Sequence, residues 1–345
     1  MRVTRLTSVV ARTVSLIPTA RQQFWLQTHE PEPNYPHMAN LQRTFRGWRF
    51  HLGGRISMAF VHSPGRRYAL ATGAVVFLAV LTIAGSLAAE TLTLRLLIDC
   101  RDGRLDEIKF STAALIASGV EDESELADWT AAYAEHSNRV LNRFPEGPDS
   151  DRLRAIHAEM QATILTGSYR ISATDLRLAL SEGDFNCLSS VAIYFDLCRS
   201  AGVELEIWLA RGHVYLKGNQ ECGISSIEPE SPVWGEATFA ARPGARRITP
   251  VELLGKFYYN RGVQMLRDRR FAEGVELLKV SLTLDPADAD ARANLAAGFN
   301  NWAAEQCARG RYSDAASLIQ RGLEIEPAFA PLIANERLVR GKLSY

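Results

Sequence analysis

The chain has 345 residues, of which 47% are hydrophobic and 23% are charged, as in an ordinary globular protein. This length indicates two or three domains. The 39 basic and 39 acidic residues cancel, which excludes a protein that binds nucleic acid through its overall charge.

The first 67 residues carry an excess of positive charge. They contain ten Arg, no Lys and only two acidic residues, Glu30 and Glu32. We expect residues 1–67 to be poorly ordered, or to form an amphipathic stretch near a membrane.

An apolar segment, residues 68–89, comes next and has no charged side chain. As a helix it would be roughly 30 Å long, which is enough to cross a bilayer. Arg66 and Arg67 precede it and Glu90 follows it. This asymmetry predicts a membrane-anchored or exported protein with residues 90–345 outside the cytoplasm.

The fate of this segment has three interpretations. It is a retained transmembrane helix, or it is the apolar part of a signal peptide that begins at Met58 and ends in the small residues 85–89. In the second case residues 1–57 would not be translated. A buried core helix is the third interpretation, and the lack of any polar face argues against it.

Five cysteines bear on export and on metal binding: Cys100, Cys187, Cys198, Cys222 and Cys307. If Cys187 is a free thiol, the other four allow three disulfide pairings, which the sequence leaves open. None of the five has the close spacing of a zinc ribbon, so we predict no metal site and no cofactor.

A helical region is predicted over residues 104–170. Apolar side chains recur at helical spacing from residue 123 to 143. Pro and Gly interrupt the pattern at residues 145–148, and helices are expected again over 149–165 and 174–180.

The following segment predicts an α+β domain over residues 171–250. Asn186 is placed to cap a helix that ends at Gly202. Strand patterns then run over residues 205–210, 213–217 and 223–228. A helix followed by sequential strands is typical of an α+β core.

Cys187 is expected at the first position of that helix, where backbone amides and the helix dipole favour a thiolate. A thiolate nucleophile needs a base, and His213 begins the second predicted strand, residues 213–217. Glu228 ends the strand after that, and neighbouring strands lie about 4.8 Å apart. These residues predict a catalytic triad, against the alternatives of a core cysteine, a structural histidine and a plain strand end.

The order of these three residues resembles the transglutaminase-like superfamily of the papain-type cysteine fold. Residues 169–206, the run RGHVYLK around His213 and the run SSIEPES around Glu228 carry the resemblance. It is nearest to the bacterial branch with helical N-terminal and tetratricopeptide segments. The chain departs from the family pattern in having Glu228 in place of Asp, and Leu188 and Tyr215 in place of Trp.

The resemblance implies acyl transfer, in which Cys187 attacks an amide carbonyl and water or an amine resolves the thioester. His213 would be the general base and acid, and Glu228 would orient it. The Cys187 backbone amide would stabilise the oxyanion. Asn186 and Tyr169 are candidates for support, although a helix cap and a turn explain them equally well.

Two similar segments predict paired helices over residues 251–345. They end at Pro286 and Pro327, and Phe271 of the first aligns with Tyr312 of the second. The segments resemble tetratricopeptide repeats, although the two prolines are 41 residues apart and not 34. We expect the extra residues to lengthen the first helix of the second repeat.

The leading hypothesis is thus an extracytoplasmic enzyme with a Cys187–His213–Glu228 triad that acts on an amide. Peptidase, deamidase and cross-linking activities stay open. The rival hypothesis is a catalytically silent scaffold whose repeats bind a protein or peptide partner. A weaker third hypothesis makes the repeats a packing extension without a partner.

Overall fold

The computed structural model describes four ranges of the chain: residues 92–142, 147–218, 226–234 and 244–343. All of them belong to one compact unit. The predicted basic region 1–67, the apolar segment 68–89 and Cys222 lie outside these ranges. Within the described ranges, no helix is long and apolar enough to span a membrane.

The part of the chain before the sheet is helical, as predicted. Residues 92–99 are helical. The elements that follow are η1 (Cys100–Asp102), α4 (Phe110–Ser118), α5 (Glu123–Leu141), α6 (Asp149–Thr163) and α7 (Leu176–Ser181). α5 begins where Asp122 accepts hydrogen bonds from two backbone amides, which caps the helix.

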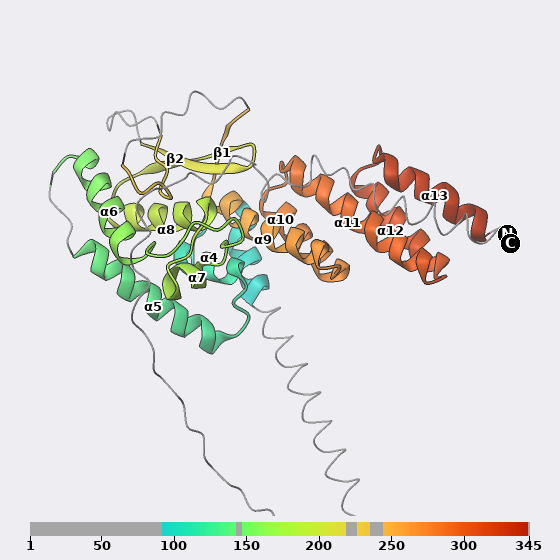
Figure 1. Ribbon diagram of the computed structural model, residues 1–345, viewed down its shortest axis with the longest axis horizontal. Coiled ribbons are helices and arrows are strands. Elements are labelled where there is room, and N and C mark those ends of the chain that lie inside the picture. Colours follow the sequence, from blue (N-terminus) through green and yellow to red (C-terminus); the bar gives the residue numbers. More distant parts are fainter. Residues whose placement is uncertain (1–91, 143–146, 219–225, 235–243, 344–345) are drawn as a thin grey trace, which may run out of the picture. The chain divides into compact units, whose positions relative to one another are not determined.

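Helix α8 (Cys187–Ser200) is the centre of the core. Every residue from Cys187 to Cys198 is buried. Figure 1 shows α8 beneath strands β1 and β2, with α4, α5 and α7 on its other side. The predicted end of the helix is confirmed, because Gly202 takes a left-handed conformation with φ of 75°.

A three-stranded antiparallel sheet covers α8. Its order is β2-β1-β3, formed by β1 (Leu205–Ala210), β2 (His213–Gly218) and β3 (Arg246–Ile248). The first two strands and the α+β class are confirmed. The strand predicted over residues 223–228 is reduced, within its described part, to a single bridge between Ile227 and Leu216. The third strand is instead β3, which the sequence analysis missed.

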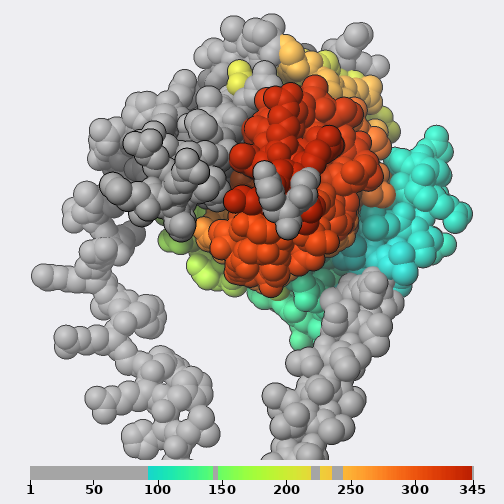
Figure 2. Space-filling model, turned by 90° about the vertical axis from the view of Figure 1, so that its right-hand side faces the viewer, coloured from blue at the N-terminus to red at the C-terminus, as the bar shows by residue number. Residues whose placement is uncertain are grey.

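Five helices follow, each packed against the next: α9 (Pro250–Arg267), α10 (Phe271–Leu284), α11 (Ala289–Ala308), α12 (Tyr312–Ile325) and α13 (Ala330–Leu343). α10 and α12 both have 14 residues and begin 41 residues apart, at 271 and 312. α11 has 20 residues, two more than α9. Figure 2 looks onto the end of this row, where α12 and α13 form the surface.

The helices of the first pair approach closely because glycine lies at their crossing. A Cβ atom at Gly274 of α10 would lie 2.7 Å from Leu266 and 2.9 Å from the Gly262 carbonyl oxygen of α9. Such distances are shorter than van der Waals contact, so the crossing requires a residue without a side chain at this position.

Candidate active site

Asn186 caps the N-terminus of α8. Its side-chain oxygen accepts hydrogen bonds from the Leu188 and Ser189 amides, and the Ser189 hydroxyl completes a capping box. The Asn186 Nδ2 group donates to the Ile171 carbonyl at 3.0 Å and to Thr174 at 2.9 Å. Both amide protons of Asn186 are therefore engaged in this structure, and Asn186 acts as the cap of α8.

Strand pairing places the predicted base and acid on one face of the sheet. Gly212, with φ of 73°, closes a two-residue turn that starts β2 at His213. Leu216 and Ile227 exchange two backbone hydrogen bonds, of 3.0 and 2.8 Å. This register places Glu228 opposite Tyr215, two residues after His213, and Glu230 follows in a turn at residues 229–230.

His213 is in direct contact with both glutamates. Its Nε2 atom lies 2.5 Å from Glu228 Oε2 and 3.4 Å from Glu230 Oε1. The other Glu228 oxygen accepts from Ser226 at 3.4 Å. The Tyr215 ring stacks on the imidazole with an interplanar angle of 11°. The structure thus brings together the predicted base and its orienting acid, and adds Glu230.

Two side chains of helix α6 hydrogen-bond with the turn that carries Glu228 and Glu230. His157 Nε2 lies 2.9 Å from the Ser231 carbonyl oxygen, and Gln161 Nε2 donates to the Pro229 carbonyl at 2.8 Å. Burial lowers the pKa of His157, which favours its neutral form. His157 and Gln161 support the site in a way that sequence reasoning did not find.

The Cys187 thiol lies beside β2. It accepts a hydrogen bond from the backbone amide of Val214, the residue after His213, and it also hydrogen-bonds with the Tyr169 hydroxyl. The residue as a whole is 6% exposed. The Cys187 thiol therefore lies beside the strand that begins with His213, and the His213 imidazole contacts Glu228.

The predicted thiolate is not the resting state of this cysteine. Burial, followed by the charge of Glu230, raises the pKa of Cys187 to about 12. The Val214 amide and the Tyr169 hydroxyl lower that pKa without offsetting the burial. The prediction that the helix terminus would favour the thiolate is wrong for this reason: a charged sulfur loses its hydration when it is enclosed.

Tyr169 reaches the thiol from a segment fixed to the start of α8. Tyr169 and Phe185 form a parallel bridge, and Asp184 accepts a hydrogen bond from the Ser168 amide at 2.8 Å. Gly183 is needed here, because its φ is 75° and a Cβ atom would lie 2.4 Å from the Thr166 hydroxyl. Tyr169 is thus a neighbour of Cys187, and its predicted supporting role stays a prediction.

Glu230 is the ionisable group that the sequence analysis missed. Its Oε2 atom is buried and has no hydrogen-bond partner. Burial is the first cause that raises its pKa to about 7, the nearby Glu228 raises it further, and the charge of His213 opposes both. The spacing of Glu228 and Glu230, two residues apart beside a strand that begins with His213, was the available signal.

The same three side chains form the one group with metal-ligand spacing that the described residues contain. Ligand atoms of His213, Glu228 and Glu230 lie within 4.8 Å of one another. Two ligands of a tetrahedral zinc ion lie roughly 3.4 Å apart, given bonds of about 2.1 Å. The contact of 2.5 Å between His213 and Glu228 is shorter than this and fits a hydrogen bond.

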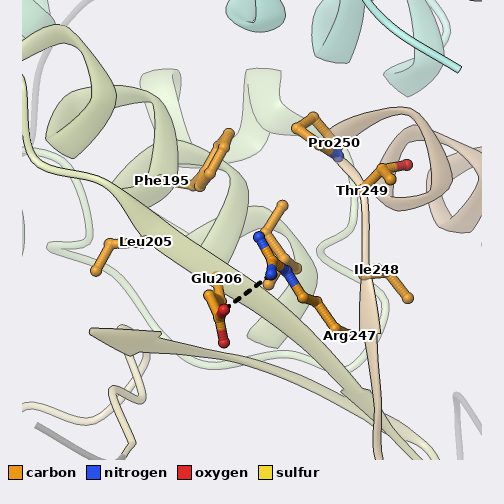
Figure 3. A pocket seen from close by; sticks show the side chains of 8 residues that line it. Phe195, Leu205, Glu206, Arg247, Ile248, Thr249 and Pro250 are labelled. Atoms are coloured by element: carbon orange, nitrogen blue, oxygen red, sulfur yellow. Dashed lines mark ion pairs between the residues drawn. The ribbon is translucent and has the colours of Figure 1, made fainter. Parts of the chain in front are cut away.

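A separate pocket of about 360 Å³ contains none of these groups. Figure 3 shows Glu206 and Arg247 facing each other in it, and their ion pair measures 3.0 Å. Most of the other residues around it are apolar, among them Phe195 of α8 and Ile248 of β3. The pocket offers no cysteine or histidine, so it does not compete as a site for thiol chemistry.

The four described cysteines, Cys100, Cys187, Cys198 and Cys307, are all free thiols. Comparisons of the chain with protein-family models, with curated proteins and with solved structures find no match. The function must therefore be argued from the geometry of the site.

Proposed function

We propose that the protein catalyses thiol-dependent acyl transfer or hydrolysis on an amide, with Cys187 as nucleophile, His213 as base and Glu228 as the acid that orients the base. The observation that carries the proposal is the 2.5 Å contact between His213 Nε2 and Glu228 Oε2, on the strand whose Val214 amide hydrogen-bonds with the Cys187 thiol. A carboxylate on one imidazole nitrogen fixes the tautomer, so that the other nitrogen serves the nucleophile.

In this proposal the thiol proton passes to His213 Nδ1 as the sulfur attacks the carbonyl carbon. The carbonyl oxygen becomes an oxyanion near the Cys187 backbone amide. The Tyr169 hydroxyl, which is hydrogen-bonded to the sulfur at rest, is a second hydrogen-bond donor to the oxyanion. The imidazolium then gives its proton to the leaving amine, and a thioester remains. Water or another amine attacks the thioester and regenerates the thiol.

The proposed setting is a membrane-tethered or exported protein of the transglutaminase-like class. The uncharged segment 68–89 supports this setting, and its Arg-rich flank supports an extracytoplasmic position for residues 90–345. Helices α9–α13 would form tetratricopeptide-like repeats that bind a protein or peptide substrate. The 41-residue recurrence of two 14-residue helices supports that part of the proposal.

A second candidate function is a catalytically silent scaffold, in which the helix row binds a partner and the cysteine core is only structural. The burial of Cys187 favours it, because a pKa of about 12 leaves almost no thiolate at neutral pH. The two candidates differ in one measurable property, which is whether Cys187 can be acylated.

The test is reaction of the full-length protein with p-nitrophenyl acetate, an activated ester. Attack by Cys187 would release p-nitrophenolate and leave an acetyl thioester, visible by mass spectrometry of the Cys187 peptide. We expect Cys187→Ala and His213→Ala to abolish acetylation at this site. Cys198→Ala removes a buried thiol of the same helix and serves as the matched control.

Acetylation of Cys187 that is fast in the parent and lost in His213→Ala supports the enzyme. Equal acetylation in the parent and in His213→Ala, or none in either, contradicts it and favours the scaffold. Loss of folding in Cys187→Ala would also count against a catalytic role, since a nucleophile contributes little to stability.

A further inference from the structure

Helix α6 is in contact with both parts of the candidate site. It packs against α8, the helix that begins with Cys187, and Figure 1 shows the two helices side by side. The Tyr194 hydroxyl of α8 donates a hydrogen bond of 2.7 Å to the Leu153 carbonyl of α6. The turn that follows Glu228 hydrogen-bonds with the same helix. One rigid element therefore touches the helix of the proposed nucleophile and the turn of the proposed acid.

The turn that carries the acid has a defined shape but few attachments to the sheet. The Ser231 amide donates to the Glu228 carbonyl at 3.0 Å, which closes a four-residue turn with Pro229 at its second position. Within the described residues, one bridge, between Ile227 and Leu216, pairs this segment with a strand. The place of the Glu228 side chain therefore depends on what holds the far side of the turn.

Two side chains of α6 hold that far side. His157 and Gln161 are four residues apart, so they lie on one face of the helix. His157 Nε2 lies 2.9 Å from the Ser231 carbonyl oxygen, and because a carbonyl only accepts, this nitrogen carries the proton. Gln161 Nε2 donates to the Pro229 carbonyl at 2.8 Å and to the Ser231 carbonyl at 3.3 Å. The carbonyls on both sides of Glu230 are thus anchored.

The surroundings of His157 show what its imidazole adds to this anchor. The side chain is buried, and its ring packs between Tyr194 of α8 and Trp234, which follows the turn, at centroid distances of 6.2 and 5.2 Å. An apolar ring would fill the same space among these aromatic side chains. Burying a polar ring is costly unless it is hydrogen-bonded, so the contribution specific to histidine is its hydrogen bond to the turn.

We propose that His157 is a positioning residue of the candidate site: together with Gln161 it holds the turn so that Glu228 stays against the His213 imidazole. The inference rests on the proposed function, in which Glu228 orients the base. A turn released from α6 would let the carboxylate leave its 2.5 Å contact, and the imidazole would lose its fixed orientation. A displacement of about 1 Å in such a group can lower a rate about a hundredfold.

Three substitutions in α6 separate this role from packing. His157→Phe removes the donor and keeps a ring between the two aromatic neighbours. Gln161→Met removes the second donor from a side chain that is only partly buried, so it tests the inference if His157→Phe fails to fold. Thr163→Val is the matched control, because the Thr163 hydroxyl donates to the Glu159 carbonyl at 2.7 Å, within α6 itself.

The first readout is proton NMR of the full-length protein. An imidazole N–H in a short hydrogen bond with a carboxylate resonates far downfield of ordinary amide protons. The parent should show such a resonance, assigned to the His213–Glu228 contact by its loss in His213→Ala and in Glu228→Gln. It should disappear in His157→Phe, weaken in Gln161→Met and remain in Thr163→Val. A loss of stability alone would not move this resonance while the protein stays folded.

The second readout is acetylation of Cys187 by p-nitrophenyl acetate. Its rate should fall about a hundredfold in His157→Phe and remain near the parent rate in Thr163→Val.

The inference is overturned by a parent without the downfield resonance, or by α6 variants that retain it. It is also overturned by an equal loss in Thr163→Val, or by a His157→Phe variant that loses the resonance and keeps the parent rate. The proposed function fails separately, when the parent itself leaves no acetyl group on Cys187. Loss of the resonance in His157→Phe would then retain the placement of Glu228 by α6 and reject the enzyme.

Discussion

Replacing Glu230 with Gln should stabilise the fold at alkaline pH. The pKa of Glu230 rises from its ordinary value near 4.5 to about 7 because of burial. The folded protein therefore holds this proton more tightly than the unfolded chain does. Below pH 4.5 both states are protonated, and Glu230 contributes no penalty. As the pH rises from 4.5 to 7 the unfolded state loses its proton first, and the folded state becomes progressively less stable.

The magnitude follows from the size of that change in pKa. One pKa unit corresponds to about 1.4 kcal/mol, so a rise from 4.5 to about 7 predicts a penalty of about 3 kcal/mol above pH 7. Gln cannot ionise, so the Glu230→Gln variant avoids this penalty. Urea unfolding of the full-length chain, followed by tryptophan fluorescence, should give free energies for parent and variant that differ by no more than about 0.5 kcal/mol at pH 4.5. At pH 8 Glu230→Gln should be more stable by up to about 3 kcal/mol.

The control is Glu204→Gln, which removes an exposed carboxylate just before β1. It should change stability by no more than about 0.5 kcal/mol at either pH. The reasoning is refuted if the Glu230→Gln difference is the same at pH 4.5 and pH 8, because a pH-independent effect would come from packing and not from charge.

Two further variants test the supports of the site and of the helix row. Asn186→Ala removes the α8 cap and the hydrogen bonds to Ile171 and Thr174. It should lower the free energy of urea unfolding by about 2–3 kcal/mol. A decrease of less than about 0.5 kcal/mol would contradict the capping role. Gly274→Ala should lower the free energy of unfolding by about 1–3 kcal/mol, because its Cβ would overlap α9. Gly341→Ala is the control, since its Cβ would meet no atom within 4 Å and should not destabilise the fold. Equal effects of the two substitutions would exclude the close crossing of α9 and α10.

The core helix and the first two strands were predictable because their signals are local. Asn186 before the helix and Gly202 after it mark both ends of α8, and alternation marks β1 and β2. The strand β3 was not predictable in this way. It has three residues, Arg246–Ile248, and it exists through its pairing with β1 nearly forty residues earlier. No local pattern records such a pairing.

The candidate triad was predicted from residue types, spacing and a family resemblance, and Glu230 was left out of it for a related reason. A triad needs one acid for one base, and Glu228 meets that need, so the sequence gives no reason to add the acid two residues later. The structure shows that the bridge between Leu216 and Ile227 sets the register for both acids. That register, and the burial that follows from it, depends on tertiary contacts with α6 that sequence spacing does not contain.

The ionisation of Cys187 depends on which of two opposing effects is larger. A helix N-terminus stabilises a negative charge by at most about 2 kcal/mol. The rise of the Cys187 pKa from 9.0 to about 12 corresponds to about 4 kcal/mol in the opposite direction. Burial therefore prevails at rest, and a thiolate needs a proton acceptor inside the same enclosed space. His213 is that acceptor in the proposed function, and the Glu228 carboxylate at its Nε2 atom stabilises the imidazolium that results.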